Sequence, residues 1–107
     1  MGRPGIRVWV SASMANRSLY VIAYDMCNDR RRAKLARLME SYGARVQGSV
    51  FEAYLTALEV KEIIQKSKRL IKEEDTLRLY YLCEDCRQKV RVEGTGQVSE
   101  PPGVVIL

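Results

Sequence analysis

The residue best placed for chemistry is Asp25, which stands where an apolar run ends and an arginine-rich segment begins. Residues 19–24 are uninterrupted apolar or aromatic, a pattern typical of a central strand that is covered on both faces. An aspartate at the end of such a strand is most often a turn or capping residue. Alternatively it binds a metal, because Mg²⁺ accepts one or two carboxylates together with waters and substrate phosphates. A twofold dimer would supply two copies of Asp25.

A cluster of basic residues follows Asp25 along the chain. Its members are Arg30, Arg31, Arg32, Lys34 and Arg37. Such a cluster is either a solvated helix face or a phosphate-binding surface, for which the guanidinium group is well shaped. Three of the arginines crowd the expected start of a helix, where the helix dipole disfavours cations. A bound anion would offset that cost, so the position favours phosphate binding.

The chain contains no histidine, and its cysteines number three. Ser-His and Cys-His nucleophilic pairs and histidine-ligated metal sites are therefore excluded within the chain. Cys83 and Cys86 form a Cys-x-x-Cys pair, but the thioredoxin-like setting of a redox motif is missing. A zinc site would need four ligands, and only two copies of the chain could supply them. We expect the thiols to be packed as small buried hydrophobes.

Composition indicates one small domain of the cytoplasm. The chain has 107 residues, enough for a single core. An odd number of cysteines argues against a secreted disulfide framework, and no segment approaches the roughly 20 apolar residues of a membrane span. The net charge of +5 mildly favours a polyanionic partner such as nucleic acid.

Hydrophobic periodicity predicts an alternation of strands and helices. Strands are expected over residues 19–24, 76–82 and 90–93, helices over 30–42 and 57–72, and a short turn or helical piece over 83–89. Residues 45–55 form either one kinked strand or a tight pair of strands, because Gly48 marks a bend or bulge. Asn28 and Asp29 can cap the first helix, and a capping box of Thr56 and Glu59 opens the second. Gly43 is expected to end the first helix in the left-handed conformation. This order fits an α+β, ferredoxin-like βαββαβ sandwich with two helices on one face of an antiparallel sheet.

The same pattern divides the chain into three segments. These are an N-terminal extension at 1–18, a ferredoxin-like domain at 19–94, and a C-terminal linker and tail strand at 95–107. Residues 1–13 are expected to be dispensable, because they lack a core-facing pattern. The second face of the sheet stays partly apolar, which predicts a homodimer with sheets facing each other. We expect the apolar run Val104 to Leu107 to add to a sheet edge of the partner.

Two motifs, in order, resemble the CRISPR-associated Cas-two (Cas2) family, the small adaptation proteins that accompany the Cas-one integrase. They are the run from Leu19 to Asp25 followed by Asp29 and Arg30 to Arg32, and the run from Arg45 to Glu52 after Gly43. The resemblance extends from about residue 18 to residue 94. It implies a ferredoxin-like homodimer. Members are described as Mg²⁺-dependent nucleases on RNA or DNA, and as the central bridge of the spacer-integration complex.

The resemblance carries over to individual site residues. They are Tyr24, Asp25, Arg32, Lys34, Arg45, Ser49 and Phe51. Asp25 matches the metal-binding aspartate of the family. Lys34 stands where arginine is common, and lysine keeps the charge but loses the bidentate geometry. Gly48 replaces a common aromatic residue.

The leading hypothesis is metal-assisted phosphodiester hydrolysis of single-stranded RNA, double-stranded DNA or both, during spacer acquisition. Asp25 from each protomer would hold Mg²⁺, which activates water. The nucleic-acid-binding residues would be Arg30, Arg31, Arg32, Lys34 and Arg45, with Tyr24, Ser49 and Phe51 shaping the site. The competing hypothesis is a non-catalytic bridge that binds double-stranded DNA and docks the integrase, in which Asp25 is structural.

Overall fold

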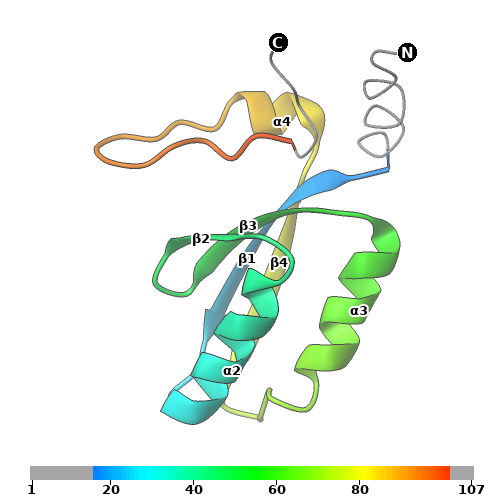
Figure 1. Ribbon diagram of the computed structural model, residues 1–107, viewed down its shortest axis with the longest axis vertical. Helices are drawn as coiled ribbons and strands as arrows, with labels where there is room; N and C mark the ends of the chain where they lie inside the picture. Colours follow the sequence, from blue (N-terminus) through cyan, green and yellow to red (C-terminus); the bar gives the residue numbers. More distant parts are fainter. Residues whose placement is uncertain (1–15, 102–107) are drawn as a thin grey trace.

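The computed structural model describes residues 16–101, which form a four-stranded antiparallel sheet with two helices on one face (Figure 1). The elements are β1 (Ser18–Asp25), α2 (Asp29–Glu40), β2 (Ala44–Gln47), β3 (Val50–Leu55), α3 (Ala57–Ser67), β4 (Thr76–Leu82) and α4 (Glu84–Gln88). The strand order β2-β3-β1-β4 places the uninterrupted apolar strand β1 at the centre. The predicted ferredoxin-like α+β fold is confirmed.

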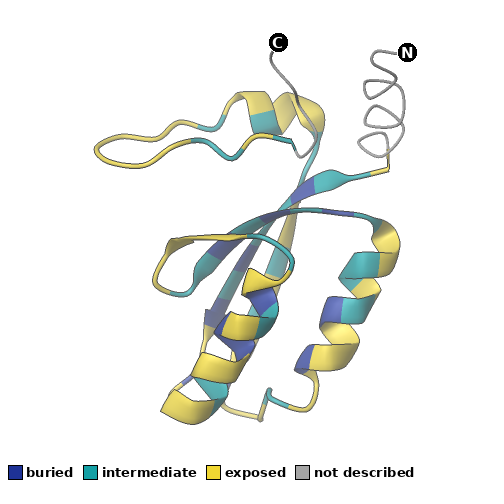
Figure 2. Ribbon diagram, viewed as in Figure 1, coloured by how far each residue is buried: buried dark blue, intermediate teal, exposed yellow. Residues whose placement is uncertain are grey.

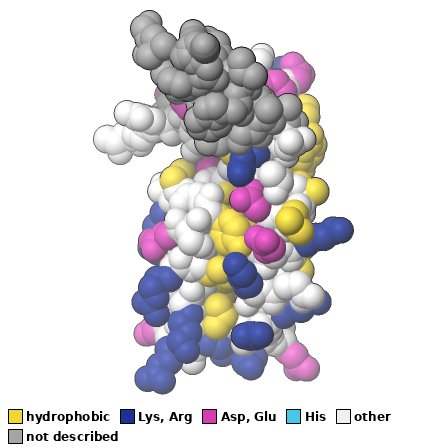
Figure 3. All heavy atoms as spheres, turned by 45° about the vertical axis from the view of Figure 1, so that its right-hand side comes forward, with side chains coloured by type: hydrophobic (Ala, Val, Ile, Leu, Met, Phe, Trp, Pro, Cys, Tyr) yellow, Lys and Arg dark blue, Asp and Glu magenta, His cyan; other side chains and the backbone are white. Residues whose placement is uncertain are grey.

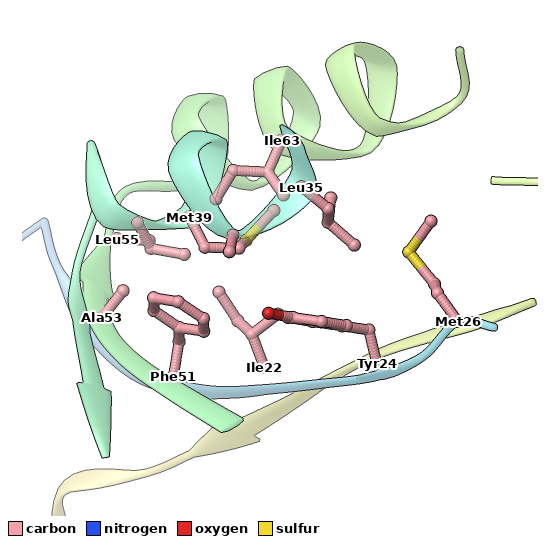
Figure 4. Packing of buried hydrophobic residues seen from close by; sticks show 10 residues of the cluster. Ile22, Tyr24, Met26, Leu35, Met39, Phe51, Ala53, Leu55 and Ile63 are labelled. Atoms are coloured by element: carbon pink, nitrogen blue, oxygen red, sulfur yellow. The ribbon is translucent and has the colours of Figure 1, made fainter. Parts of the chain in front are cut away.

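The core lies between the sheet and the two helices α2 and α3, as the buried positions in Figure 2 and the packed side chains in Figure 4 show. It consists mainly of Ile22, Tyr24, Met26, Leu35, Met39, Phe51, Ala53, Leu55 and Ile63. Ile22 is paired with Phe51 on β3 and with Leu79 on β4, so the three strands present apolar side chains to the helices in register. Alternate residues of a strand point to opposite faces. The other face, here called the free side, therefore carries Val21, Ala23 and Asp25 of β1 and Val50, Glu52 and Tyr54 of β3.

Both helices begin as predicted, but α3 ends earlier. The Asn28 side chain accepts a hydrogen bond from the Arg31 N–H at 2.9 Å, and Thr56 and Glu59 form a complete capping box. We expected α3 to reach residue 72, and that is wrong because the N–H groups of residues 70 and 71 both turn back to the Ser67 carbonyl. The chain then leads into β4, with residues 70 and 71 packed on the core from outside the helix.

Gly43 has a different reason for being glycine from the one predicted. Among the described residues, only Gly94 and Gly96 have a positive φ, so Gly43 does not end α2 in the left-handed conformation. A Cβ at Gly43 would instead lie 2.3 Å from the Glu52 carbonyl oxygen. The glycine therefore allows the chain to pass close to the backbone of β3. Residues 45–55 form a tight pair of strands, β2 and β3, with an irregularity between Arg45 and Gln47.

Residues 90–93 do not form the strand that we predicted. A strand needs a hydrogen-bonded neighbour, and the four strands within residues 16–101 pair with one another. The segment instead leaves α4, turns back and returns towards the sheet (Figure 1). There the Ser99 carbonyl accepts a hydrogen bond from the Tyr54 hydroxyl at 3.0 Å, and the Ser99 hydroxyl donates to Glu52. Part of the free side is thus covered by the same chain.

Two expectations concern residues outside this range. The dispensable segment 1–13 and the tail strand Val104 to Leu107 both lie outside the described residues. Within residues 16–101, none of the helices has the length and apolar character needed to cross a membrane.

Candidate nucleic-acid interface

A hollow of about 510 Å³ opens on the helix side of the sheet beside the end of β1. Its lining consists of Tyr24, Asp29, Arg32, Ala33, Ala36, Arg45, Gly48 and Ser49. Strand β1, the first turns of α2, and β2 with the turn that follows it each contribute to it. Four of the site residues predicted from the sequence, Tyr24, Arg32, Arg45 and Ser49, therefore meet at one place.

Tyr24 forms the floor of the hollow. Its backbone N–H donates to the Ser49 carbonyl at 3.2 Å, and its ring stacks on Phe51 with centroids 6.2 Å apart. Burial raises the pKa of the Tyr24 hydroxyl, while the nearby Arg45 and Arg32 guanidinium groups act in the opposite direction. The net shift is upward, so the hydroxyl stays protonated and can donate a hydrogen bond to an anion at neutral pH.

Arg32 is held at the rim of the hollow by its own segment. One guanidinium nitrogen, Nη1, donates to the Met26 carbonyl at 2.9 Å, and Nη2 pairs with the Asp29 carboxylate. The pair with Asp29 lies near the surface, where ion pairs contribute little to stability. A phosphate oxygen could therefore compete for this guanidinium without a large cost to the fold.

Arg45 approaches the hollow from β2. Its guanidinium lies over the ring of the fully buried Phe51, 5.3 Å from the ring centroid, and 3.4 Å from a Glu40 carboxylate oxygen. Stacking on an aromatic ring orients the planar guanidinium while leaving donors free. Phe51 thus shapes the site indirectly, by orienting Arg45 and by packing against Tyr24.

Arg31 is placed differently from its neighbours. Its Nη2 lies 2.8 Å from Oδ2 of Asp75, whose side chain is completely buried, and 3.8 Å from a Glu74 oxygen. The same Asp75 oxygen accepts the Lys72 N–H at 2.8 Å. Arg31 therefore joins the start of α2 to the segment before β4. Asp75 was missed from the sequence because residues 73–75 are all acidic, and nothing in that run shows which of them is buried.

Asp25 lies outside the hollow. It follows Tyr24 directly, but strand alternation turns it to the free side, where it is exposed and makes no ion pair within residues 16–101. The same range contains no group of three or more metal-ligating side chains. Arg30 and Lys34 are also exposed, and neither has an ion-pair partner in the described part of the chain. The structure thus places Asp25 one residue from the hollow but on the opposite side of the sheet.

The cysteines are not packed as we expected. Cys27, in the loop before α2, and Cys86 are exposed, Cys83 is partly exposed, and no residue of the short helix α4 is buried. The Sγ of Cys83 accepts the Cys86 N–H at 3.4 Å. Hydrogen bonds from Cys86 lower the pKa of the Cys83 thiol, and the Cys83 side chain raises the pKa of Cys86.

Comparison with known proteins matches the family expected from the two motifs. The model of the family described as CRISPR associated protein Cas2 matches residues 18–90. The chain is 44% identical over 90 residues to a protein named CRISPR-associated endoribonuclease Cas2 3 from Synechocystis, covering 83% of the chain and 98% of that protein. It is 52% identical over 90 residues to CRISPR-associated endoribonuclease Cas2 of Thermus thermophilus, covering 79% and 96%.

Solved structures agree. Streptococcus pyogenes Cas2 superposes with a TM-score of 0.64 at 30% identity, covering 71% of this chain and 99% of that one. A chain of a partial Cas6-RT-Cas1–Cas2 complex gives a TM-score of 0.68 at 34% identity, covering 84% and 99%. The family match extends over β1 to α4, the elements that build the hollow and carry Asp25. The chain therefore belongs to the CRISPR-associated protein Cas2 family.

Proposed function

We propose that the protein is a Mg²⁺-dependent endonuclease of CRISPR adaptation, acting in the cytoplasm as a homodimer on RNA, double-stranded DNA or both. The observation that carries the proposal is the hollow, where two guanidinium groups and a protonated tyrosine hydroxyl lie beside the strand end that bears Asp25. Curated relatives named as endoribonucleases support the same activity.

The residues of the hollow suit a phosphodiester. Arg32 and Arg45 supply positive charge and several N–H donors, and the Tyr24 hydroxyl supplies a neutral donor. These groups would hold the backbone of the nucleic acid by charge-assisted hydrogen bonds to its phosphates. None of them is a general base at neutral pH, so activation of water must come from elsewhere.

Asp25 fits a magnesium ion only in part. A single carboxylate is too small a ligand set for a closed metal site, but Mg²⁺ commonly takes one or two carboxylates with waters and substrate phosphates. Because Asp25 is exposed on the free side, a second copy packed there would bring a second carboxylate close to it. When bound, Mg²⁺ would lower the pKa of a coordinated water. The hollow, on the other side of the sheet, would hold a neighbouring part of the same nucleic-acid backbone.

A dimer through the free side is supported by the side chains left there. Tyr80 of β4 is 49% exposed, and Val21 and Ala23 are only partly buried. The segment at Ser99 forms hydrogen bonds with Glu52 and Tyr54 of β3. Packing two free sides together would bury this apolar surface.

The test is a cleavage assay on single-stranded RNA and on double-stranded DNA, with Mg²⁺ and with EDTA. Asp25→Asn should abolish Mg²⁺-dependent cleavage and leave nucleic-acid binding intact or slightly tighter, because a negative charge near the phosphates is lost. Asp85→Asn, which removes an exposed carboxylate on α4, is the matched control and should cleave normally. Wild-type protein that shows no Mg²⁺-dependent cleavage would overturn the proposal.

A second candidate is the non-catalytic bridge of double-stranded DNA within an integrase complex. Two observations favour it: residues 16–101 contain no group of three or more metal-ligating side chains, and a structural neighbour comes from a complex containing Cas1 and Cas2. In this case the same hollow grips DNA without cutting it, and the Cas1 integrase is the partner. Spacer integration that survives Asp25→Asn, with no cleavage by wild type, would establish the bridge in place of the nuclease.

A further inference from the structure

A second group of cations lies at the same end of the helix layer as the start of α2, on the side of α3. Lys68, Arg69 and Lys72 follow the end of α3, and all three are exposed. None of them has an ion-pair partner among residues 16–101. Figure 1 shows that the end of α3 and the start of α2 lie at the same end of the molecule. Figure 3 shows lysine and arginine side chains gathered at this end.

One buried carboxylate holds this group beside α2. Asp75 Oδ2 accepts from Arg31 Nη2 and from the Lys72 N–H, each at 2.8 Å. The segment after α3 is therefore fixed against the first turn of α2. Asp75 also compensates the charge of Arg31, while Arg30 and Lys34 on the same helix stay exposed and unpaired within residues 16–101. We call the unpaired set the basic end surface: Arg30, Lys34, Lys68, Arg69 and Lys72.

Local helix electrostatics explains only part of this surface. Lys68 and Arg69 follow the C-terminus of α3, where cations favourably face the helix dipole. Arg30 sits in the first turn of α2, where the dipole disfavours a cation. Lys72 lies beyond the last turn of α3 and gains nothing from its dipole. The nearby Glu74 is directed to Arg31, 3.8 Å away, and not to the lysines.

We infer that the basic end surface is a second binding site for the phosphate backbone of a nucleic acid that extends beyond the hollow. The inference rests on the proposed function, because it assumes a nucleic-acid substrate, and it adds where a long substrate is held. The basic end surface presents the ammonium groups of its three lysines and two exposed guanidinium groups, that of Arg30 on α2 and that of Arg69 after α3. None of its five members is an aromatic residue on which a base could stack. Such a surface binds backbone independently of base sequence and in a salt-dependent way.

The test compares two triple variants with the same net charge. Lys68→Gln/Arg69→Gln/Lys72→Gln removes three of the cations of the basic end surface, and Lys61→Gln/Lys89→Gln/Arg91→Gln removes three exposed cations elsewhere. Binding is measured by fluorescence anisotropy with a duplex of about one helical turn, roughly 10 base pairs, and with one about three times longer. All replaced side chains are exposed, so thermal midpoints should match wild type.

The variant Lys68→Gln/Arg69→Gln/Lys72→Gln, here called the surface variant, should bind the long duplex about tenfold more weakly than wild type near 0.1 M salt. Its salt slope should fall by about 3 units, at roughly 0.9 for each of the three phosphates that are no longer neutralised. Its affinity for the short duplex should change less than twofold. The control variant should change less than twofold for both duplexes. The double variant Lys68→Arg/Lys72→Arg keeps the positive charge at both positions and should retain long-duplex binding.

Three outcomes would overturn the inference. They are an unchanged affinity of the surface variant, an equal loss in the control variant, and binding of anionic lipid vesicles in preference to duplex. Failure of the nuclease is separable, because it is read from Mg²⁺-dependent cleavage of single-stranded RNA and of the short duplex. A wild type that does not cleave, together with selective loss of long-duplex binding, would remove the nuclease and keep the basic end surface.

Discussion

The two sides of the sheet at the end of β1 differ in how complete they are. On the helix side, Tyr24, Arg32 and Arg45 all have partners within the chain and converge on one hollow. On the free side, the next residue, Asp25, is exposed and makes no ion pair in the described range. Under the proposed function, one chain therefore builds a finished phosphate-binding side but supplies only half of a metal-binding side. Completing the second side requires another carboxylate, and a second copy is its simplest source.

The largest effect on the finished side should come from Asp75→Ala. It leaves the guanidinium of Arg31 mostly buried without its carboxylate, which costs about 3–5 kcal/mol for a buried pair. Glu74→Ala is the matched control: its carboxylate is 63% exposed and 3.8 Å from the same guanidinium, so it should cost less than about 0.5 kcal/mol. Urea unfolding of both variants measures the difference. Equal losses of unfolding free energy in the two variants would mean that the acidic residues 73–75 stabilise Arg31 together and that Asp75 has no special role.

The next largest effect should come from Gly43→Ala. Its Cβ would lie 2.3 Å from the Glu52 carbonyl oxygen, and because that oxygen is backbone, β3 must shift, at a cost of about 1–3 kcal/mol. Gly48→Ala is the control, since a Cβ there meets nothing within 4 Å and the variant should be neutral or slightly stabilised. The thermal midpoints of the two variants test this. An unchanged thermal midpoint for Gly43→Ala would show that the strand pair β2 and β3 can shift at little cost. The hollow, to which β2 contributes, would then be able to change shape.

Much of the fold could be predicted because it depends on local signals. The apolar run of β1, the Asn28 cap and the Thr56–Glu59 capping box each act within a few residues, and each is found in the structure. The errors have two different causes. The early end of α3 comes from a turn at Ser67 that the apolar periodicity of residues 70 and 71 hides, and the absence of a strand at 90–93 depends on pairing with residues far along the chain, which periodicity does not encode.

The site shows the same division. The two motifs contain four residues of the hollow, Tyr24, Arg32, Arg45 and Ser49, because each motif falls on elements that line it. They could not show that Tyr24 and Asp25 face opposite sides of the sheet with different surroundings, nor that Arg31 is taken up by Asp75 while Arg32 lines the hollow. Those distinctions come from strand alternation and from a contact between residues 44 positions apart.

The contact that covers part of the free side should be weaker. Tyr54→Phe removes the hydrogen bond to the Ser99 carbonyl at 3.0 Å and should cost about 1 kcal/mol, mainly by local opening of the segment around Ser99. Tyr80→Phe, which removes an exposed hydroxyl bonded to Arg78, is the control. Hydrogen exchange across residues 90–101 should become faster in the first variant alone. Unchanged exchange would mean that this segment is held by the Glu52–Ser99 bond instead.

The smallest effect on the metal-free chain should come from Asp25→Asn, and it bears most directly on the difference between the two sides. An exposed side chain without an ion pair in the described range contributes less than about 0.5 kcal/mol to folding, and relief of repulsion between two Asp25 carboxylates in a dimer would make the variant slightly more stable. Adding Mg²⁺ should reverse the order. Wild type would gain RT ln(1 + [Mg²⁺]/Kd), about 1.4 kcal/mol at ten times Kd, whereas the variant would gain nothing. Thermal unfolding with and without Mg²⁺, each followed at two protein concentrations, measures both parts. A Mg²⁺ stabilisation that persists in Asp25→Asn would place the ion elsewhere. A large loss of stability without metal would mean that Asp25 is a structural turn residue and that the free side holds no metal.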